Sequence, residues 1–135
     1  MRVEIMPSLS EVDRVIDLAD RFARQSGFAP ALTHRLKIVA EELARNVILH
    51  GEPTAENPIA PSLEGTKTEI EIALVDRGRP FDPRTDLDTP VRGADTAPEI
   101  EGGAGWPLIL EWCQIESYER VGEENRLRLT LTSGT

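Results

Sequence analysis

The chain has 135 residues, about the length of one domain, and a net charge of −9 at pH 7. A charge of this sign opposes binding to nucleic-acid phosphates, and no apolar run approaches the roughly 20 residues of a membrane span, so neither partner is expected. The single cysteine, Cys113, cannot pair within the chain, and the N-terminus lacks the apolar core of a signal peptide, so we expect a cytoplasmic protein and a buried, unreactive thiol.

The first elements alternate between a short strand and two helices. Residues Val3 to Met6 predict a strand that stops at Pro7, and Ser8 or Ser10 is a suitable N-cap for the helix that follows. Gly27 ends this first helix. Its apolar residues recur at helical spacing: Val12, Val15, Ile16, Ala19 and Phe22.

A second helix begins around Pro30 and Thr33 and ends at Gly51, directly after His50. Its apolar positions predict one stripe that faces the core: Leu36, Val39, Ala40, Leu43 and Val47. Residues 52–66 then read as a loop with a poor strand at Ile59–Leu63, which its prolines place at a sheet edge.

The second half is dominated by strands. Residues Thr68–Val75 alternate clearly between apolar and polar types, whereas Asp82–Glu101 has no periodicity and predicts a long loop of the kind that forms lids. A short helix at Pro107–Trp112 precedes Gln114–Val121 and Arg126–Thr132, which predict a hairpin around the turn GEEN. The order of elements predicts one α/β domain over residues 1–135, a two-layer sandwich with a mixed, largely antiparallel sheet and helices on one face.

The second helix carries the first polar motif, Glu42 and Asn46, one helical turn apart in LKIVAEELARNVILHG. At 100° per residue both lie about a right angle from the core stripe, where Ile38 and Leu49 also indicate a half-buried flank. An asparagine oxygen is a suitable ligand for Mg²⁺, and a carboxylate one turn away can orient or deprotonate a hydroxyl. The alternative is a solvated glutamate beside an asparagine that bonds to nearby backbone.

The second motif is Asp76 followed by Gly78 in VDRGRPFDP, at the end of the predicted strand. A carboxylate at this position can accept a hydrogen bond from an exocyclic amine such as that of adenine, and glycine lets the backbone approach a flat ring. The alternative is an ordinary D-x-G turn at a strand end.

The third motif is the glycine group Gly102, Gly103 and Gly105, which precedes Trp106 and Pro107. A helix that begins after flexible glycines presents free N–H groups to a phosphate, although the same glycines also suit a hinge for the long loop. The spacing matches neither the dinucleotide-binding fingerprint nor the P-loop.

Other site classes have no support. His34 and His50 do not form a metal cluster, and one cysteine makes structural zinc improbable. No G-x-S-x-G context supports a hydrolase triad.

The three motifs in this order resemble the histidine-kinase-like (Bergerat-fold) ATPases, and most of all the small bacterial anti-sigma factor serine kinases. The resemblance implies that Glu42 is the catalytic carboxylate and Asn46 the magnesium ligand. It also implies that Asp76 contacts the base with Gly78 behind it. Gly103 and Gly105 would lie under the phosphates of ATP.

The resemblance extends to the final hairpin, where Asn125 is a weaker candidate for a further contact near the base. The chain departs from the family at Trp106, where leucine is usual, and at the following Pro107. The implied function is a kinase that uses ATP and Mg²⁺ to phosphorylate a serine of an anti-sigma-factor antagonist and that sequesters a sigma factor. Members of this family are often homodimers.

Two alternatives stay open at this point. The chain could bind nucleotide to shape a partner-binding surface without phosphotransfer. It could also be an α/β domain in which all three motifs are accidental turns.

Overall fold

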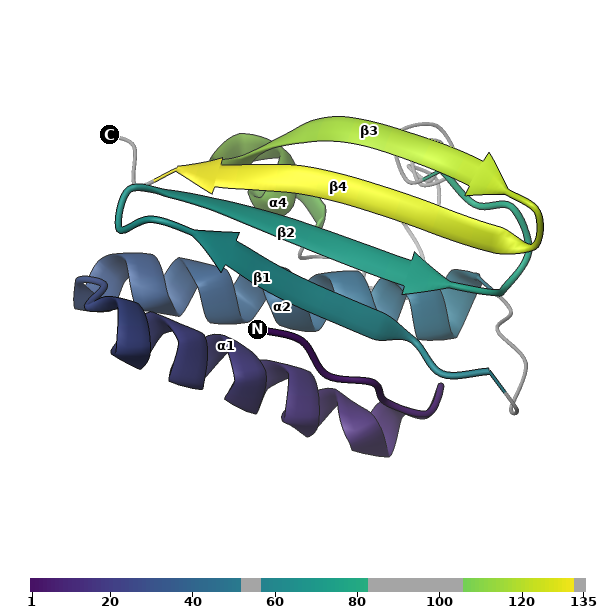
Figure 1. Cartoon of the computed structure of the whole chain (residues 1–135), viewed down its shortest axis with the longest axis horizontal. Coiled ribbons are helices and arrows are strands. Elements are labelled where there is room, and N and C mark those ends of the chain that lie inside the picture. Colours follow the sequence, from purple (N-terminus) through teal and green to yellow (C-terminus); the bar gives the residue numbers. More distant parts are fainter. Residues whose placement is uncertain (52–56, 83–105, 133–135) are drawn as a thin grey trace, which may run out of the picture.

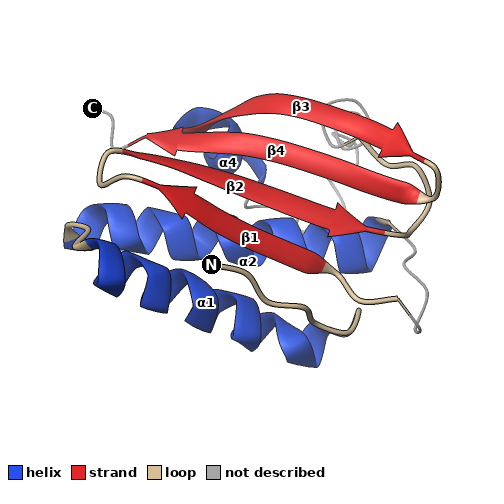
Figure 2. Cartoon of the chain, in the orientation of Figure 1, coloured by secondary structure: helices blue, strands red, loops and turns tan. Residues whose placement is uncertain are grey.

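A computed structural model describes residues 1–51, 57–82 and 106–132 of the chain. In this part of the chain, four strands form one sheet in the order β1-β2-β4-β3, and each neighbouring pair is antiparallel. Figures 1 and 2 show the helices gathered on one side of this sheet. The bounds are η1 Leu9–Glu11, α1 Val12–Ser26, α2 Pro30–His50, β1 Ala60–Gly65, β2 Glu69–Asp76, α4 Trp106–Trp112, β3 Cys113–Val121 and β4 Glu124–Thr132. The predicted two-layer α/β sandwich is confirmed.

The two long helices begin and end at the residues that the sequence indicated. Gly27 ends α1 because it adopts a left-handed conformation (φ 73°), from which its N–H reaches the carbonyls of Ala23 and Arg24. Pro30 is the first residue of α2, and the N–H of Gly51 closes the helix on the carbonyl of Val47. Ser8 caps the short 3₁₀ helix η1 rather than α1, which has no side-chain cap.

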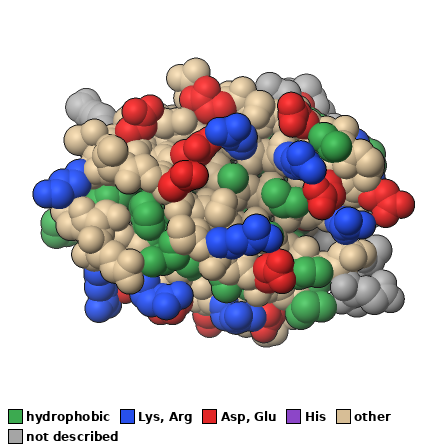
Figure 3. Space-filling model, in the orientation of Figure 1, with side chains coloured by type: hydrophobic (Ala, Val, Ile, Leu, Met, Phe, Trp, Pro, Cys, Tyr) green, Lys and Arg blue, Asp and Glu red, His purple; other side chains and the backbone are tan. Residues whose placement is uncertain are grey.

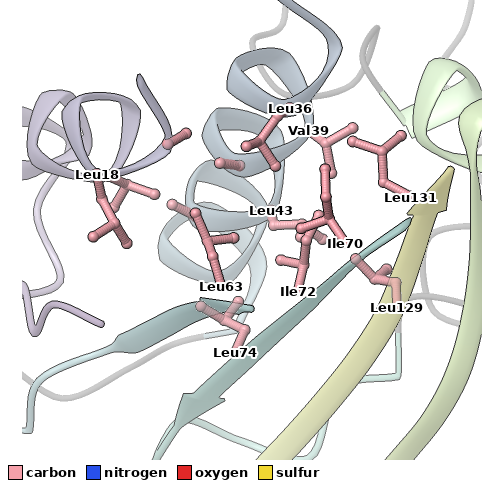
Figure 4. Close-up of a cluster of buried hydrophobic side chains, with 14 of the residues drawn as sticks. Leu18, Leu36, Val39, Leu43, Leu63, Ile70, Ile72, Leu74, Leu129 and Leu131 are labelled. Atoms are coloured by element: carbon pink, nitrogen blue, oxygen red, sulfur yellow. The ribbon is translucent and has the colours of Figure 1, made fainter. Parts of the chain in front are cut away.

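The hydrophobic core lies between the sheet and the helices. Strands β2 and β4 alternate strictly between buried and accessible residues, so one face of the sheet packs on α1 and α2 and the other faces solvent. Figure 4 shows the centre of this core, where leucines of the helices and strands meet; the labelled residues are Leu18, Leu36, Val39, Leu43, Leu63, Ile70, Ile72, Leu74, Leu129 and Leu131.

The predicted strand at Val3–Met6 is wrong as a regular strand. The N-terminal segment instead forms two isolated antiparallel bridges, Arg2 to Ser62 and Ile5 to Ile59, along the outer edge of the sheet. Pro7 ends this pairing after a few residues because it lacks the N–H that a continued ladder requires. The prediction of an edge position for the proline-containing strand is confirmed, since β1 is the outermost of the four strands.

The hairpin of β3 and β4 has a tighter turn than predicted. Val121 pairs with Glu124, so the turn consists of Gly122 and Glu123, and Gly122 takes the left-handed conformation (φ 63°) that a two-residue hairpin turn requires.

Strand β3 also contains a bulge between Ile115 and Ser117. Leu129 and Leu127, two residues apart on β4, pair with Ile115 and Tyr118, which are three residues apart on β3. The bulge therefore turns Tyr118 toward the helices, a position that strict alternation would give to Ser117.

The surface carries charges of both signs. Figure 3 shows basic and acidic side chains intermixed over one face of the molecule. Among the described residues, no helix is both long enough and apolar enough to cross a membrane.

Candidate functional site

Four polar residues are buried in the described part of the chain, and all were singled out from the sequence. Glu42 is 8% exposed and Asn46 3% exposed on α2, while Asp76 is 5% exposed at the end of β2 and Asn125 3% exposed near the start of β4. Burial of polar groups costs free energy unless they find partners, so these side chains identify a place where the fold accepts that cost.

Asn46, Asp76 and Asn125 line one pocket between α2 and the sheet. Glu42 lies one turn before Asn46 on the same helix and is not among the lining residues. The full lining consists of Leu43, Asn46, Val47, Leu74, Asp76, Phe81, Tyr118, Asn125 and Leu127.

Asn46 contributes a carboxamide that the protein itself does not satisfy. Both Oδ1 and Nδ2 are buried, and neither has a hydrogen-bond partner among the residues that the structure describes. The alternative of an asparagine that bonds to nearby backbone is therefore wrong for this residue. A buried amide without partners costs about 1–3 kcal/mol, a cost that a bound ligand can remove.

Asp76 presents its two carboxylate oxygens to different surroundings. Oδ1 accepts hydrogen bonds from the N–H of Gly78 at 2.8 Å and from Nδ2 of Asn125 at 3.0 Å. Within the described residues Oδ2 receives no hydrogen bond, so it is the oxygen with acceptor capacity left. One side of the carboxylate is thus fixed by the protein and the other is available at the pocket.

Gly78 is required by a contact with the end of α2. A Cβ at this position would lie 2.2 Å from the carbonyl oxygen of Gly51 and 3.2 Å from Oδ1 of Asp76. The N–H of Arg79 donates to the same Gly51 oxygen at 2.8 Å, and Nε of Arg79 donates to the carbonyl of His50 at 2.9 Å. The backbone that Gly78 approaches in the structure is therefore the protein's own, whereas its predicted place behind a base stays a prediction.

Two pocket-side residues were missed from the sequence. Tyr118 donates a short hydrogen bond to Oδ1 of Asn125 and accepts one from the N–H of Phe81 at 3.1 Å. Arg120 donates to the carbonyl of Gly78 at 2.7 Å and to Oδ1 of Asn125 at 3.3 Å. The sequence carried no signal for them, because their orientation depends on the bulge in β3.

His50 and Cys113 have shifted pKa values for the same reason. Burial, and secondarily the positive charge of Arg79, lowers the pKa of His50, which stacks on Phe81 with ring centroids 6.2 Å apart. Burial raises the pKa of the Cys113 thiol to about 12, in agreement with the expectation of an unreactive cysteine, but the residue is half-buried and not fully buried as predicted.

The glycine motif lies largely outside the described residues, which exclude Gly102, Gly103 and Gly105. Helix α4 begins directly after them, at Trp106 and Pro107. Their predicted position under the phosphates stays a prediction. Among the described residues, no group of three histidine, cysteine or acidic side chains is arranged to hold a metal ion.

Comparisons with known proteins agree with this geometry. Residues 5–131 match the model of the histidine kinase-like ATPase domain. The chain is 29% identical over 116 residues to the serine/threonine-protein kinase BtrW of Bordetella bronchiseptica, an alignment that covers 82% of this chain and 78% of BtrW.

Solved structures share the fold at low sequence identity. The catalytic domain of the histidine kinase ThkA, in a nucleotide-free form, superposes with a TM-score of 0.50 at 16% identity, covering 98% of this chain and 97% of that domain. A chain of the SiaB–SiaC complex from Pseudomonas aeruginosa superposes with a TM-score of 0.54 at 11% identity, covering 97% of this chain and 88% of that chain. The histidine kinase AdeS of Acinetobacter baumannii superposes with a TM-score of 0.52 at 16% identity, covering 100% of this chain and 68% of that chain.

The family match spans nearly the whole chain and includes the helix of Asn46, the strand of Asp76 and the pocket between them. The chain therefore belongs to the histidine kinase-like ATPase family.

Proposed function

We propose that this protein is an ATP-dependent serine kinase and transcriptional regulator. It binds ATP with Mg²⁺ in the pocket between α2 and the sheet and phosphorylates a serine of an anti-sigma-factor antagonist. The observation that carries the proposal is the buried carboxamide of Asn46, whose atoms have no partner among the described residues, across one pocket from Asp76.

The side chains present suit a magnesium nucleotide better than a metal held by protein alone. Oδ1 of Asn46 is a neutral, hard oxygen that can fill one coordination position, and Mg²⁺ in proteins usually takes its other ligands from water and phosphate. The described residues contain no cluster of several carboxylates or histidines that would hold a metal independently. When bound, Mg²⁺ supplies neutralisation of phosphate charge.

The residues of this chain divide the work between binding and proton transfer. Oδ2 of Asp76 accepts a hydrogen bond from the exocyclic amine of adenine, which a guanine carbonyl cannot provide. Glu42, one turn before Asn46, orients the serine hydroxyl and accepts its proton as that oxygen attacks the γ-phosphorus of ATP. ADP leaves, and Gly103 and Gly105 cover the phosphates from the loop before α4.

The choice of a protein substrate follows the similarity to BtrW, which is named a serine/threonine-protein kinase. The anti-sigma role follows the resemblance of the motifs to small anti-sigma factor kinases. In this proposal, phosphorylation releases the antagonist and frees the protein to hold a sigma factor inactive. Such a role requires a cytoplasmic protein, and a homodimer is part of the same proposal.

The test measures transfer of labelled phosphate from ATP to the antagonist with the wild type and with Glu42→Gln. We expect Glu42→Gln to slow transfer by about 10²–10⁴-fold while ATP affinity changes little. Glu41→Gln is the matched control, because Glu41 precedes it on the same helix and is 40% exposed at its side chain. Equal transfer rates for Glu42→Gln and the wild type would refute the assigned base.

A second function is favoured by the start of α4. Pro107 is the second residue of this helix and lacks an N–H, which removes one of the donors that a helix start offers to phosphate. The protein would then be a nucleotide-binding regulatory module without phosphotransfer. Tight Mg²⁺-dependent ATP binding with no labelled antagonist would establish this function in place of the kinase.

A further inference from the structure

The side chain of Asn125 lies at the centre of a hydrogen-bond network on the Asp76 side of the pocket. Its Nδ2 donates to Oδ1 of Asp76 at 3.0 Å and to the carbonyl of Arg79 at 2.8 Å. Its Oδ1 accepts from the hydroxyl of Tyr118 and from Nη1 of Arg120 at 3.3 Å. These contacts join β4, β3 and the chain that follows β2.

The chemistry of these partners fixes the orientation of the amide. Nδ2 faces two acceptors, a carboxylate and a carbonyl, while Oδ1 faces a guanidinium and a hydroxyl. The reverse orientation would put the NH₂ group against the guanidinium of Arg120 and oxygen against the carboxylate of Asp76.

The same contacts use all of the amide's hydrogen-bonding capacity. A carboxamide has two N–H donors and two acceptor lone pairs on its oxygen, and the four contacts occupy each of them. Asn125 is 3% exposed, so it has neither free capacity nor open surface for a base. The expectation of a direct contact between Asn125 and the nucleotide therefore does not fit this geometry.

Of the site residues in this network, Asp76 is the one with hydrogen-bonding capacity left for a nucleotide base. Two hydrogen bonds, from Gly78 and Asn125, hold Oδ1, and their directions determine where Oδ2 points. Tyr118 in turn holds the amide of Asn125 in place, and the β3 bulge brings Tyr118 to the pocket.

We infer that Asn125 and Tyr118 are positioning residues that determine selectivity for an exocyclic amine by fixing the Asp76 carboxylate. The inference rests on the proposed ATP site. Tyr118 lines the pocket and acts through Asn125, and Asn125 acts through Asp76. Neither needs a hydrogen bond to the nucleotide.

The experiment compares two nucleotides that differ by one group. ATP and purine riboside 5′-triphosphate have the same phosphates and ring shape, but the second lacks the exocyclic amine. Their dissociation constants are measured by isothermal titration with Mg²⁺ for the wild type, Asn125→Ala and Tyr118→Phe. Ser117→Ala is the control, since it removes a hydroxyl from the same strand without touching the pocket, and thermal unfolding checks that each variant is folded.

We expect the wild type to bind ATP about tenfold or more tightly than the analogue, because the bound analogue covers Oδ2 of Asp76 without donating a hydrogen bond to it. Asn125→Ala should reduce the ratio of the two dissociation constants to near one, mainly by weakening the binding of ATP. Tyr118→Phe should reduce the same ratio severalfold. Ser117→Ala should leave the ratio unchanged.

If the two residues had a purely structural role, the variants would bind both nucleotides more weakly by the same factor and the ratio would be preserved. That result overturns the inference, and so does an unchanged ratio in Tyr118→Phe. If Asn125→Ala does not fold, Tyr118→Phe alone decides between these outcomes. If the wild type binds ATP and the variants keep its selectivity for ATP over the analogue, only the positioning role is refuted. A wild type that binds neither nucleotide refutes the proposed function and this inference with it.

Discussion

Replacement of Asn46 by leucine should make the protein more stable while it removes nucleotide binding. The side chain is 3% exposed and both amide atoms are buried without partners in the described part of the chain, which costs about 1–3 kcal/mol in the absence of ligand. Leucine removes this cost, gains a few tenths of a kcal/mol in helix propensity, and joins apolar neighbours such as Leu43, Val47 and Leu74 at the pocket.

A gain of about 1–3 kcal/mol corresponds to a rise in the unfolding midpoint of roughly 4–10 °C for a chain of 135 residues. Urea and thermal unfolding without nucleotide measure the gain, and an unchanged urea m-value shows that the compared states are the same. Titration with Mg-ATP should show at least tenfold weaker binding. Glu41→Leu, on the same helix and away from the pocket, should change stability by less than about 0.5 kcal/mol.

Two variants separate the amide from the volume of leucine. Leucine is larger than asparagine and could crowd the pocket, so Asn46→Ala is measured beside it. If both variants unfold at lower urea concentrations than the wild type, the amide of Asn46 stabilises the free protein. A ligand would then not be needed to offset the free-energy cost of burying that amide.

Three further predictions concern residues around the pocket and the core. Gly78→Ala should destabilise the fold by about 1–3 kcal/mol, because its Cβ would lie 2.2 Å from the Gly51 carbonyl oxygen; urea unfolding measures this, and a neutral effect would show that the contact relaxes easily. His50 has a lowered pKa in the folded protein, so the unfolded state binds more protons and stability falls as the pH drops below about 6.5. His50→Gln should flatten that dependence, and an unchanged slope between pH 7 and pH 5 would contradict it. Cys113, with a thiol pKa of about 12, should react with a disulfide reagent at pH 8 much more slowly than a free thiol, because little thiolate is present; reaction at the rate of a free thiol would contradict this pKa.

Much of the fold was predictable because local signals and tertiary packing agree. The apolar stripes of α1 and α2 and the alternation of β2 each match one buried face, and Gly27 and Gly51 stop the helices where the chain must turn. The segment before Pro7 is not a regular strand, although Met1, Val3 and Ile5 exchange backbone hydrogen bonds with residues 59–63, and its pairing is confined to two isolated bridges.

The site was predictable where it depends on one element and unpredictable where it depends on register. Asn46 follows from the geometry of one helix, and Asp76 from the end of one strand. Tyr118 faces the pocket only because β3 contains an extra residue, and a bulge of this kind leaves no periodic trace in nine residues. The role of Gly78 was also hidden, because the carbonyl that it approaches belongs to Gly51, far away in sequence.

The junction of Gly51 with the chain after β2 has a mechanical consequence. Backbone and side-chain hydrogen bonds from Arg79 tie it together, and the absence of a Cβ at Gly78 lets the two main chains touch. These contacts hold the Asn46 end and the Asp76 end of the pocket at a set spacing. A nucleotide shortened or lengthened between its base and its phosphates should therefore engage only one of the two ends.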